Sequence, residues 1–146
     1  MGTTLVCALI IDECLYVANV GDSRLYGFSE GNMIQITRDH SYVQTLVDLG
    51  QLTPEEADHN PHKNIITKAI GIHKKEEPDI FFDNLSASNA DYLLLCSDGL
   101  SNMLDDQEIL FEAVHGIGKH RCCKRLLDIA VSRGAPDNVT AVLILI

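Results

Sequence analysis

The sequence predicts a mixed α/β fold of the α+β type, with antiparallel strands early in the chain and helices later. Short apolar runs separated by brief turns fill residues 4–37, which is typical of strands joined in hairpins. From Tyr42 onward the apolar residues recur with the spacing of a helix. The last run, residues 139–146, is rich in Val, Leu and Ile and predicts a strand at the centre of a sheet.

Length and composition predict one folded domain. The chain has 146 residues, of which 46% are hydrophobic and 22% are charged, as in ordinary globular domains. Its formal net charge of −10 argues against a nucleic-acid partner, because binding to phosphate backbones depends on clustered Lys and Arg. The same acidity suits a site that collects cations.

Neither export nor membrane insertion is indicated. The N-terminus has no basic segment followed by an apolar one, and no apolar stretch approaches the length of a membrane-spanning helix. The five cysteines are an odd number without a C-x-x-C pair, so we expect reduced packing residues. These observations predict a cytoplasmic protein with no membrane partner.

Four strands are predicted in the first part of the chain, as two hairpins of one antiparallel meander. They are residues 4–11, 14–20, 24–28 and 33–37. Asp12-Glu13 joins the first pair, and Glu30-Gly31-Asn32 joins the second.

Two short helices and a break are predicted next. Residues 42–49 place apolar side chains on one helical face before Gly50, and Thr53-Pro54-Glu55-Glu56 is a typical capped helix start. Residues 60–64 interrupt the helical pattern. Later elements are expected as strands at 65–69, 79–82 and 92–96 and helices at 105–115 and 119–133.

A carboxylate follows the apolar run at residues 92–96, which predicts a strand buried on both faces. An ionised Asp98 at the buried end of that strand costs free energy unless a partner offsets its charge. Asp22, Asp39 and Asp137 also stand at the ends of predicted elements. Such aspartates either cap turns or gather around a hard cation, and the pattern alone leaves both interpretations open.

Two other kinds of site are not supported. Gly116-Ile-Gly-Lys-His120 lacks the earlier glycine and the following Ser or Thr of a phosphate-binding loop, so it is interpreted as a turn between helices. The six histidines form no His-x-x-x-His pair, and a zinc site is therefore not predicted.

Six short blocks along the chain carry a resemblance to a known family. They are Met1-Gly-Thr-Thr4, Asn19-Val-Gly-Asp-Ser-Arg24, Asp39-His40, Ala69-Ile-Gly71, Leu95-Cys-Ser-Asp-Gly-Leu100 and Pro136-Asp-Asn-Val-Thr140. In order and spacing the chain resembles the metal-dependent protein serine/threonine phosphatases of the 2C type, in their bacterial form. Each block alone is weak, but together they are highly specific and span nearly the whole chain.

The resemblance implies an antiparallel β-sandwich flanked by helices, present here in incomplete form. Residues 1–146 would be the C-terminal part of a single phosphatase domain, because Met1-Gly-Thr-Thr4 matches a block inside the family's domain. Residues at about 41–66 would match a flap beside the metal site. A plain helical insertion is the alternative for that segment.

The resemblance also implies the site and the reaction. Asp98 and Asp137 would bind two tightly held Mn²⁺ or Mg²⁺ ions, and Asp22 would help to bind a third, weaker ion. No catalytic residue is expected beyond these metal ligands. A water activated by the ions would hydrolyse phosphoserine and phosphothreonine in proteins, opposing a serine/threonine kinase in signalling.

Some family residues have no counterpart here. The family has a further Asp-Gly pair that bridges both ions, and an Arg and a His upstream, whereas the only Asp-Gly pair in this chain is Asp98-Gly99. We therefore expect weak metal binding and low activity from the chain alone, with Asp39 the first candidate for a replacement ligand.

Loss of the early strands and helices also predicts self-association through an uncovered apolar face. The alternative function is a non-catalytic regulatory or binding remnant of the same fold. A generic acidic α/β domain, whose aspartates all cap turns, has little support once the ordered blocks are counted.

Overall fold

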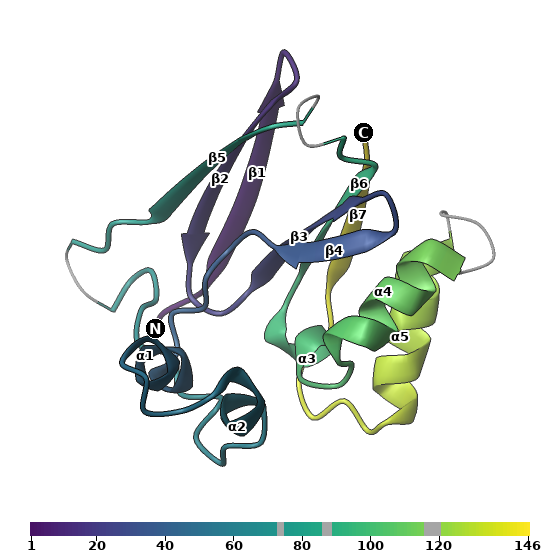
Figure 1. Ribbon diagram of the computed structural model, residues 1–146. Helices are drawn as coiled ribbons and strands as arrows, with labels where there is room; N and C mark the ends of the chain where they lie inside the picture. Colours follow the sequence, from purple (N-terminus) through teal and green to yellow (C-terminus); the bar gives the residue numbers. More distant parts are fainter. Residues whose placement is uncertain (73–74, 86–88, 116–120) are drawn as a thin grey trace.

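The strands of the chain form two antiparallel sheets, and three of its helices lie beside one of them (Figure 1). A computed structural model describes residues 1–72, 75–85, 89–115 and 121–146. The elements in chain order are β1 (Leu5–Ile11), β2 (Cys14–Val20), β3 (Arg24–Ser29), β4 (Asn32–Gln35), α1 (Tyr42–Asp48), α2 (Pro54–Asp58), β5 (Asp79–Asn84), β6 (Tyr92–Cys96), α3 (Asp98–Ser101), α4 (Asp106–His115), α5 (Cys122–Ser132) and β7 (Ala141–Leu145).

The two sheets pack against each other through a shared core. One sheet has the strand order β1-β2-β5 and the other β4-β3-β6-β7. Leu15 and Val17 of the first sheet lie in one buried cluster with Leu25 and Leu93 of the second. The predicted α+β fold, an antiparallel sandwich with flanking helices, is therefore confirmed.

The predicted single meander is wrong, although both hairpins are confirmed. β1 pairs with β2 and β3 pairs with β4, but β2 and β3 belong to different sheets. The chain changes sheets at Gly21, whose φ of +109° is a conformation that favours glycine. A Cβ at Gly21 would also overlap the side chain of Thr4.

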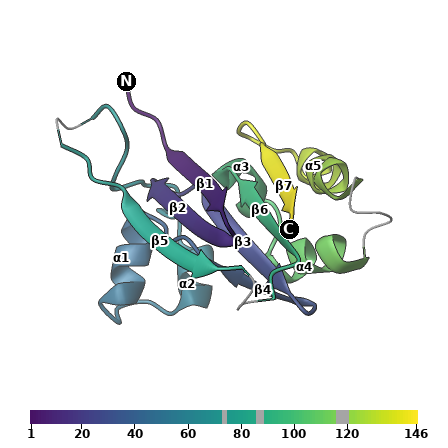
Figure 2. The same cartoon turned by 90° about the horizontal axis from the view of Figure 1, so that it is seen from above.

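Helices α3, α4 and α5 lie beside the four-stranded sheet and form a second core with it (Figure 2). Tyr26 and Leu94, which are directly opposite on β3 and β6, pack in this core with Ile109 of α4 and Leu126 of α5. Leu93, the neighbour of Leu94, faces the core between the sheets. β6 is thus buried on both faces, which explains its uninterrupted apolar run.

Two predicted strands differ from the structure. Residues 65–69 form no strand, because only Ile66 pairs, in an isolated bridge with Ser41. β7 pairs with β6 alone and is an edge strand among the described residues, so its predicted central position is wrong. An apolar run reports burial of side chains and does not specify how many strands lie beside it.

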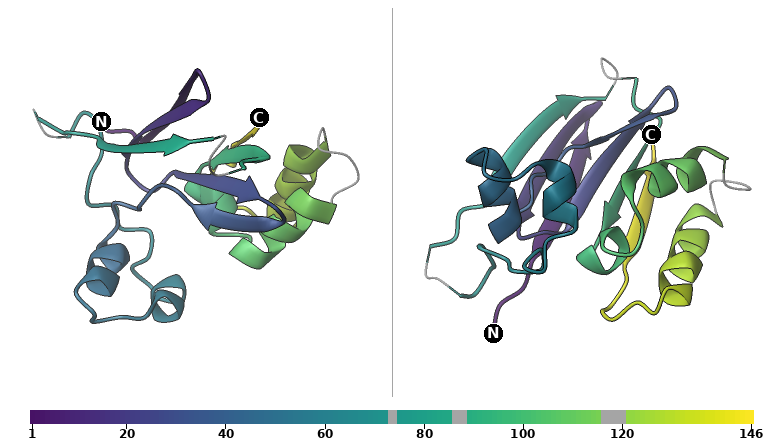
Figure 3. Two further views of the ribbon diagram at one scale, coloured as in Figure 1. Left: turned by 45° about the horizontal axis from the view of Figure 1, so that its top comes forward. Right: turned by 60° about the horizontal axis from the view of Figure 1, so that its bottom comes forward.

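Helices α1 and α2 form a unit set apart from the sandwich, which we call the flap, residues 41–66 (Figure 3). Ser41 caps α1 by accepting a hydrogen bond from the Gln44 backbone N–H at 3.2 Å, and Thr53 and Glu56 form the predicted capping box of α2. The Tyr42 N–H donates to the Ile65 carbonyl at 2.8 Å, which closes the base of the flap.

Helices α4 and α5 fall within the predicted ranges 105–115 and 119–133. The turn predicted at residues 116–120 lies outside the described residues. Within the described ranges, no helix has the length and apolar character that crossing a membrane requires.

The outer face of the three-stranded sheet is apolar and exposed. Leu9, Tyr16 and Phe82 lie side by side across β1, β2 and β5, and the rings of Tyr16 and Phe82 have centroids 5.2 Å apart. Ile80 and Phe82 are 65% and 62% exposed. We call this surface the outer face, residues Leu5, Leu9, Ile11, Tyr16, Ile80 and Phe82.

Candidate metal site

The three predicted metal ligands meet at one end of the four-stranded sheet. Arg24, Cys96 and Ala141 are paired across β3, β6 and β7. Asp22 comes just before this row and Asp98 just after it, and since neighbouring strands are antiparallel, both lie beyond the same sheet end. Asp137 precedes β7 at that end.

Hydrogen bonds around Ser97 hold the segment before β7 against the start of α3. The Thr140 N–H donates to Ser97 Oγ at 3.0 Å, and Ser97 Oγ donates to the Asn138 carbonyl at 3.2 Å. Gly99 permits this close approach, because a Cβ there would overlap the Asn138 carbonyl oxygen and lie 3.0 Å from its carbon. The Asn138 N–H also donates to Asp137 Oδ1 at 2.7 Å, which orients that carboxylate.

The carboxylates are close enough to affect one another's ionisation. Burial, followed by the negative charge of Asp98, raises the pKa of Asp22 to about 6. Burial, followed by the charge of Asp137, raises the pKa of Asp98. A cation placed among the three would offset this repulsion and favour their charged forms.

Arg24 and Asp39 form a largely buried ion pair beside these aspartates. Arg24 Nε donates to both oxygens of Asp39 at 3.1 and 3.0 Å, and Nη2 donates to Oδ2 at 2.7 Å. Gln35 Nε2 donates to Asp39 Oδ1 at 2.9 Å. Because both oxygens already have partners, Asp39 is poorly placed to act as the replacement ligand that the sequence suggested.

This ion pair is connected to α4 through a tyrosine. Arg24 Nη1 donates to the Tyr26 hydroxyl at 3.1 Å, and that hydroxyl donates to Asp106 Oδ1 at 3.2 Å. The pair thus joins β3, the segment before the flap and the start of α4.

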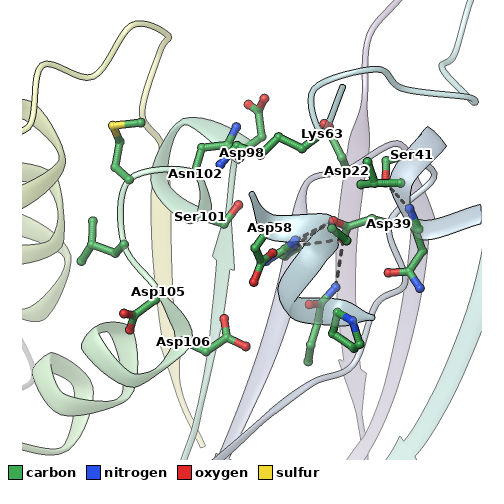
Figure 4. A pocket seen from close by; sticks show the side chains of 18 of the residues that line it. Asp22, Asp39, Ser41, Asp58, Lys63, Asp98, Ser101, Asn102, Asp105 and Asp106 are labelled. Carbon is green, nitrogen blue, oxygen red and sulfur yellow. Dashed lines mark hydrogen bonds and ion pairs between the residues drawn. The ribbon is translucent and has the colours of Figure 1, made fainter. Parts of the chain in front are cut away.

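A groove of about 740 Å³ runs between the flap and the α3–α4 segment, and Asp22 and Asp98 line it. Figure 4 shows Asp58 and Lys63 of the flap on this groove together with Ser101, Asn102 and Asp105. Asn102 Nδ2 donates to Asn64 Oδ1 at 3.1 Å and joins the end of the flap to α3.

The donors match hard cations in type but not in number. Asp22, Asp98 and Asp137 offer only carboxylate oxygens, which Mn²⁺ and Mg²⁺ prefer. Within the part of the chain that the structure describes, no three His, Cys, Asp or Glu side chains are arranged to hold a metal ion. Three carboxylates are too few to complete a site for two such ions, and the role of the three aspartates as ligands stays a prediction.

The sequence alone predicts no role for Arg24, Asn64 or Asn102 at this site. Arg24 stands in a recognised block, yet its partner Asp39 is separated from it by 15 positions. The bond between Asn64 and Asn102 spans 38 positions and has no local signal. These contacts form only when the sheets and the flap pack together in the folded chain, and short sequence patterns do not predict that packing.

The fold and the site together define a class: a two-sheet α+β domain with carboxylates collected at one sheet end beside a groove. The family model described as Protein phosphatase 2C matches residues 1–45 and 68–139 of this chain. The chain therefore belongs to the protein phosphatase 2C family. Residues 46–67, which include most of the flap, lie between the two matched stretches.

The chain is similar in sequence to bacterial protein phosphatases. The chain is 42% identical to the serine/threonine protein phosphatase PstP of Mycobacterium tuberculosis H37Rv, over 97% of this chain and 27% of that protein. It is also 42% identical to the protein phosphatase PhpP of Streptococcus pneumoniae D39, over 99% of this chain and 58% of that protein. The chain thus spans between about a quarter and three fifths of these relatives.

Solved structures of bacterial phosphatases have the same fold as this chain over its described length. The crystal structure of the serine/threonine phosphatase Stp1 from Staphylococcus aureus matches with a TM-score of 0.94 and 44% identity, over 100% of this chain and 57% of that one. The catalytic domain of PstP in complex with 2 manganese ions matches with a TM-score of 0.83 and 40% identity, over 98% of this chain and 58% of that one.

Proposed function

We propose that this chain is part of a metal-dependent enzyme that hydrolyses phosphoserine and phosphothreonine in proteins. The observation that carries the proposal is the meeting of Asp22, Asp98 and Asp137 beside the groove, in a chain of the protein phosphatase 2C family. The proposed substrates are phosphorylated proteins, and the activity opposes a serine/threonine kinase in signalling.

Asp98 and Asp137 would hold two Mn²⁺ or Mg²⁺ ions, and Asp22 would contribute to a third, weaker one. Bound ions of this kind supply an activated water and offset charge that develops on the phosphoryl oxygens. The chain's own residues position these carboxylates: Ser97 and Gly99 bring Asp137 to Asp98. The groove between the flap and α3 would receive the polypeptide around the phosphorylated residue.

The proposed location is the cytoplasm. In its support, all five cysteines are free thiols, as expected in a reducing compartment.

The test compares the 146-residue chain with a version extended upstream by a segment that holds an Asp-Gly pair after an Arg. With saturating Mn²⁺, we expect the extended version to hydrolyse p-nitrophenyl phosphate and a phosphothreonine peptide. The chain alone should be slower by roughly 100-fold, because two or three carboxylates cannot complete the coordination of two hard cations. Equal rates and tight binding of two ions by the chain alone would contradict this expectation.

A non-catalytic remnant is the second candidate. It is favoured by the small number of candidate ligands, because Asp22, Asp98 and Asp137 are too few to complete the coordination of two hard cations. An extended version that binds a phosphothreonine peptide without hydrolysing it in Mn²⁺ would support this candidate against the enzyme.

We also propose that the outer face of the three-stranded sheet is an association surface, for which a second copy of the chain is the partner. The exposure of Ile80 and Phe82 on the edge strand β5 of this apolar sheet face supports it.

A further inference from the structure

All four polar groups of His40 make contacts, and their partners lie near the predicted metal ligand Asp22, at the end of the flap and at the start of β5. Its backbone N–H donates to the Gly21 carbonyl at 2.9 Å, and its carbonyl accepts from the Thr67 N–H at 2.8 Å. Its ring Nδ1 accepts from the Gly21 N–H at 2.9 Å, and Nε2 lies 3.0 Å from Asp79 Oδ2. The side chain is only 13% exposed.

These contacts determine which nitrogen of the imidazole ring carries the proton. A backbone N–H can only donate, so Nδ1 carries no proton and the ring proton is on Nε2. Nε2–H therefore donates to Asp79, which also accepts from Lys68 Nζ at 3.2 Å. This hydrogen bond from His40 is the largest cause that lowers the pKa of Asp79.

The partners of His40 belong to three separate segments. Gly21 immediately precedes Asp22, has a φ of +109°, and lies where an added Cβ would overlap the side chain of Thr4. Thr67 directly follows the flap, while His40 directly precedes Ser41, which caps the first flap helix. Asp79 begins β5 of the other sheet. His40 is therefore bonded to the Asp22 loop and to both ends of the flap.

We propose that His40 is a positioning residue that couples the loop of Asp22 to the flap, so that ion binding at Asp22 and order in the flap depend on each other. The inference rests on the proposed metal site. The ring need not touch the ion or the substrate. It holds the backbone next to Asp22 in place through its hydrogen bond to Gly21. At other metal centres, residues that bond to the ligands but not to the metal orient the ligands in the same way.

Two substitutions separate the two ring bonds. His40→Asn retains an acceptor near the position of Nδ1 for the Gly21 N–H but loses the bond to Asp79. His40→Gln retains a donor near the position of Nε2 for Asp79 but loses the acceptor for Gly21. His115→Gln, at the exposed end of α4, is the matched control.

The measurements use the 146-residue chain and do not require turnover. Free Mn²⁺ is followed by electron paramagnetic resonance during titration, and hydrogen exchange reports the backbone order of residues 41–66. We expect His40→Gln to weaken the apparent Mn²⁺ affinity by roughly 10-fold and to speed exchange in the flap. His40→Asn should bind Mn²⁺ within about twofold of the wild type, because the Gly21 bond remains.

Each other outcome has a distinct meaning. If Asp98→Asn weakens Mn²⁺ binding but His40→Gln changes neither the affinity nor flap exchange, the coupling is wrong and the metal site stands. If His40→Asn and His40→Gln lose thermal stability and Mn²⁺ affinity to the same extent, His40 only stabilises the fold and the inference is overturned. If Asp98→Asn leaves Mn²⁺ binding unchanged, the metal site itself is refuted, and the inference with it.

Discussion

At the scale of single residues, the negative charges of Asp98 and Asp137 are what would attract cations to the proposed metal site. Asn has nearly the same shape as Asp, so Asp98→Asn or Asp137→Asn removes the charge with little change in packing. In a version extended upstream, we expect either substitution to lower Mn²⁺-dependent hydrolysis of p-nitrophenyl phosphate by more than roughly 100-fold. Asp128→Asn, on the exposed side of α5, is the matched control and should keep full activity. Full activity in Asp98→Asn would refute the assignment.

Asp22 predicts a pH dependence of stability in the absence of metal. Its pKa in the folded chain is about 6, above the value of 3.8 for a free side chain, so the folded state binds the proton more tightly. The protonated form stabilises the fold below pH 3.8, and this contribution is lost as the pH rises through about 6.

In a metal chelator, Asp22→Asn should therefore raise the melting temperature at pH 7.5 by about a few degrees and have a smaller effect at pH 4. Thermal unfolding followed by circular dichroism at both pH values tests this. An equal effect at both would show that the ionisation of Asp22 does not oppose folding.

The sequence identifies Asp22, Asp98 and Asp137 as candidate ligands because each follows or precedes a strongly apolar strand. It does not show which residues bind the neighbouring charges of Arg24 and Asp39. The sequence makes Asp39 a candidate for a replacement ligand, but in the structure both of its oxygens accept hydrogen bonds from Arg24 and Gln35. Only the meeting of β3 with the segment before the flap brings these groups together.

At the scale of elements, Gly99 sets how closely the segment before β7 approaches α3. A Cβ in Gly99→Ala would overlap the Asn138 carbonyl, and backbone atoms cannot move aside as a flexible side chain does. We expect a loss of about 1–3 kcal/mol in the free energy of unfolding, together with weaker Mn²⁺ binding as Asp137 is displaced.

Gly27→Ala is a suitable control, because its Cβ would meet the flexible end of Ile36 at 3.0 Å. Urea unfolding and Mn²⁺ titration of both variants provide the comparison. If Gly99→Ala is as mild as Gly27→Ala in both measurements, the close approach does not position Asp137.

Hairpins, caps and the doubly buried strand β6 were predictable, because alternation, turn residues and capping residues are local. Which sheet a hairpin joins was not, since β1-β2 and β3-β4 have the same kind of pattern and the chain changes sheets at Gly21. Ile65 and Ile66 suggested a strand, but they are half exposed at the base of the flap, where a single bridge replaces a ladder.

At the scale of the whole molecule, the two sheets are covered unequally. The outer side of the four-stranded sheet packs on α3, α4 and α5, whereas the outer face of the three-stranded sheet exposes Leu9, Tyr16, Ile80 and Phe82. β5 and β7 are also edge strands among the described residues, and edge strands are places where another chain can pair. In the sequence, only the family resemblance predicts this open face. Apolar residues at every position of a strand indicate that both of its faces are covered, and the pattern cannot show that the covering element is missing.

We therefore expect the 146-residue chain to sediment as a species larger than its 16.1 kDa mass, increasingly so at higher concentration. Replacing Ile80 and Phe82 together by Lys places two like charges on the apolar face and should shift the chain to the monomer in sedimentation velocity experiments. Val131→Lys is the control, because Val131 is equally exposed at 65% but lies on α5, away from the outer face. The Val131 variant should associate like the wild type. A wild-type chain that stays monomeric at every concentration tested, or a Val131 variant that dissociates as fully as the double variant, would show that the outer face is not the association surface.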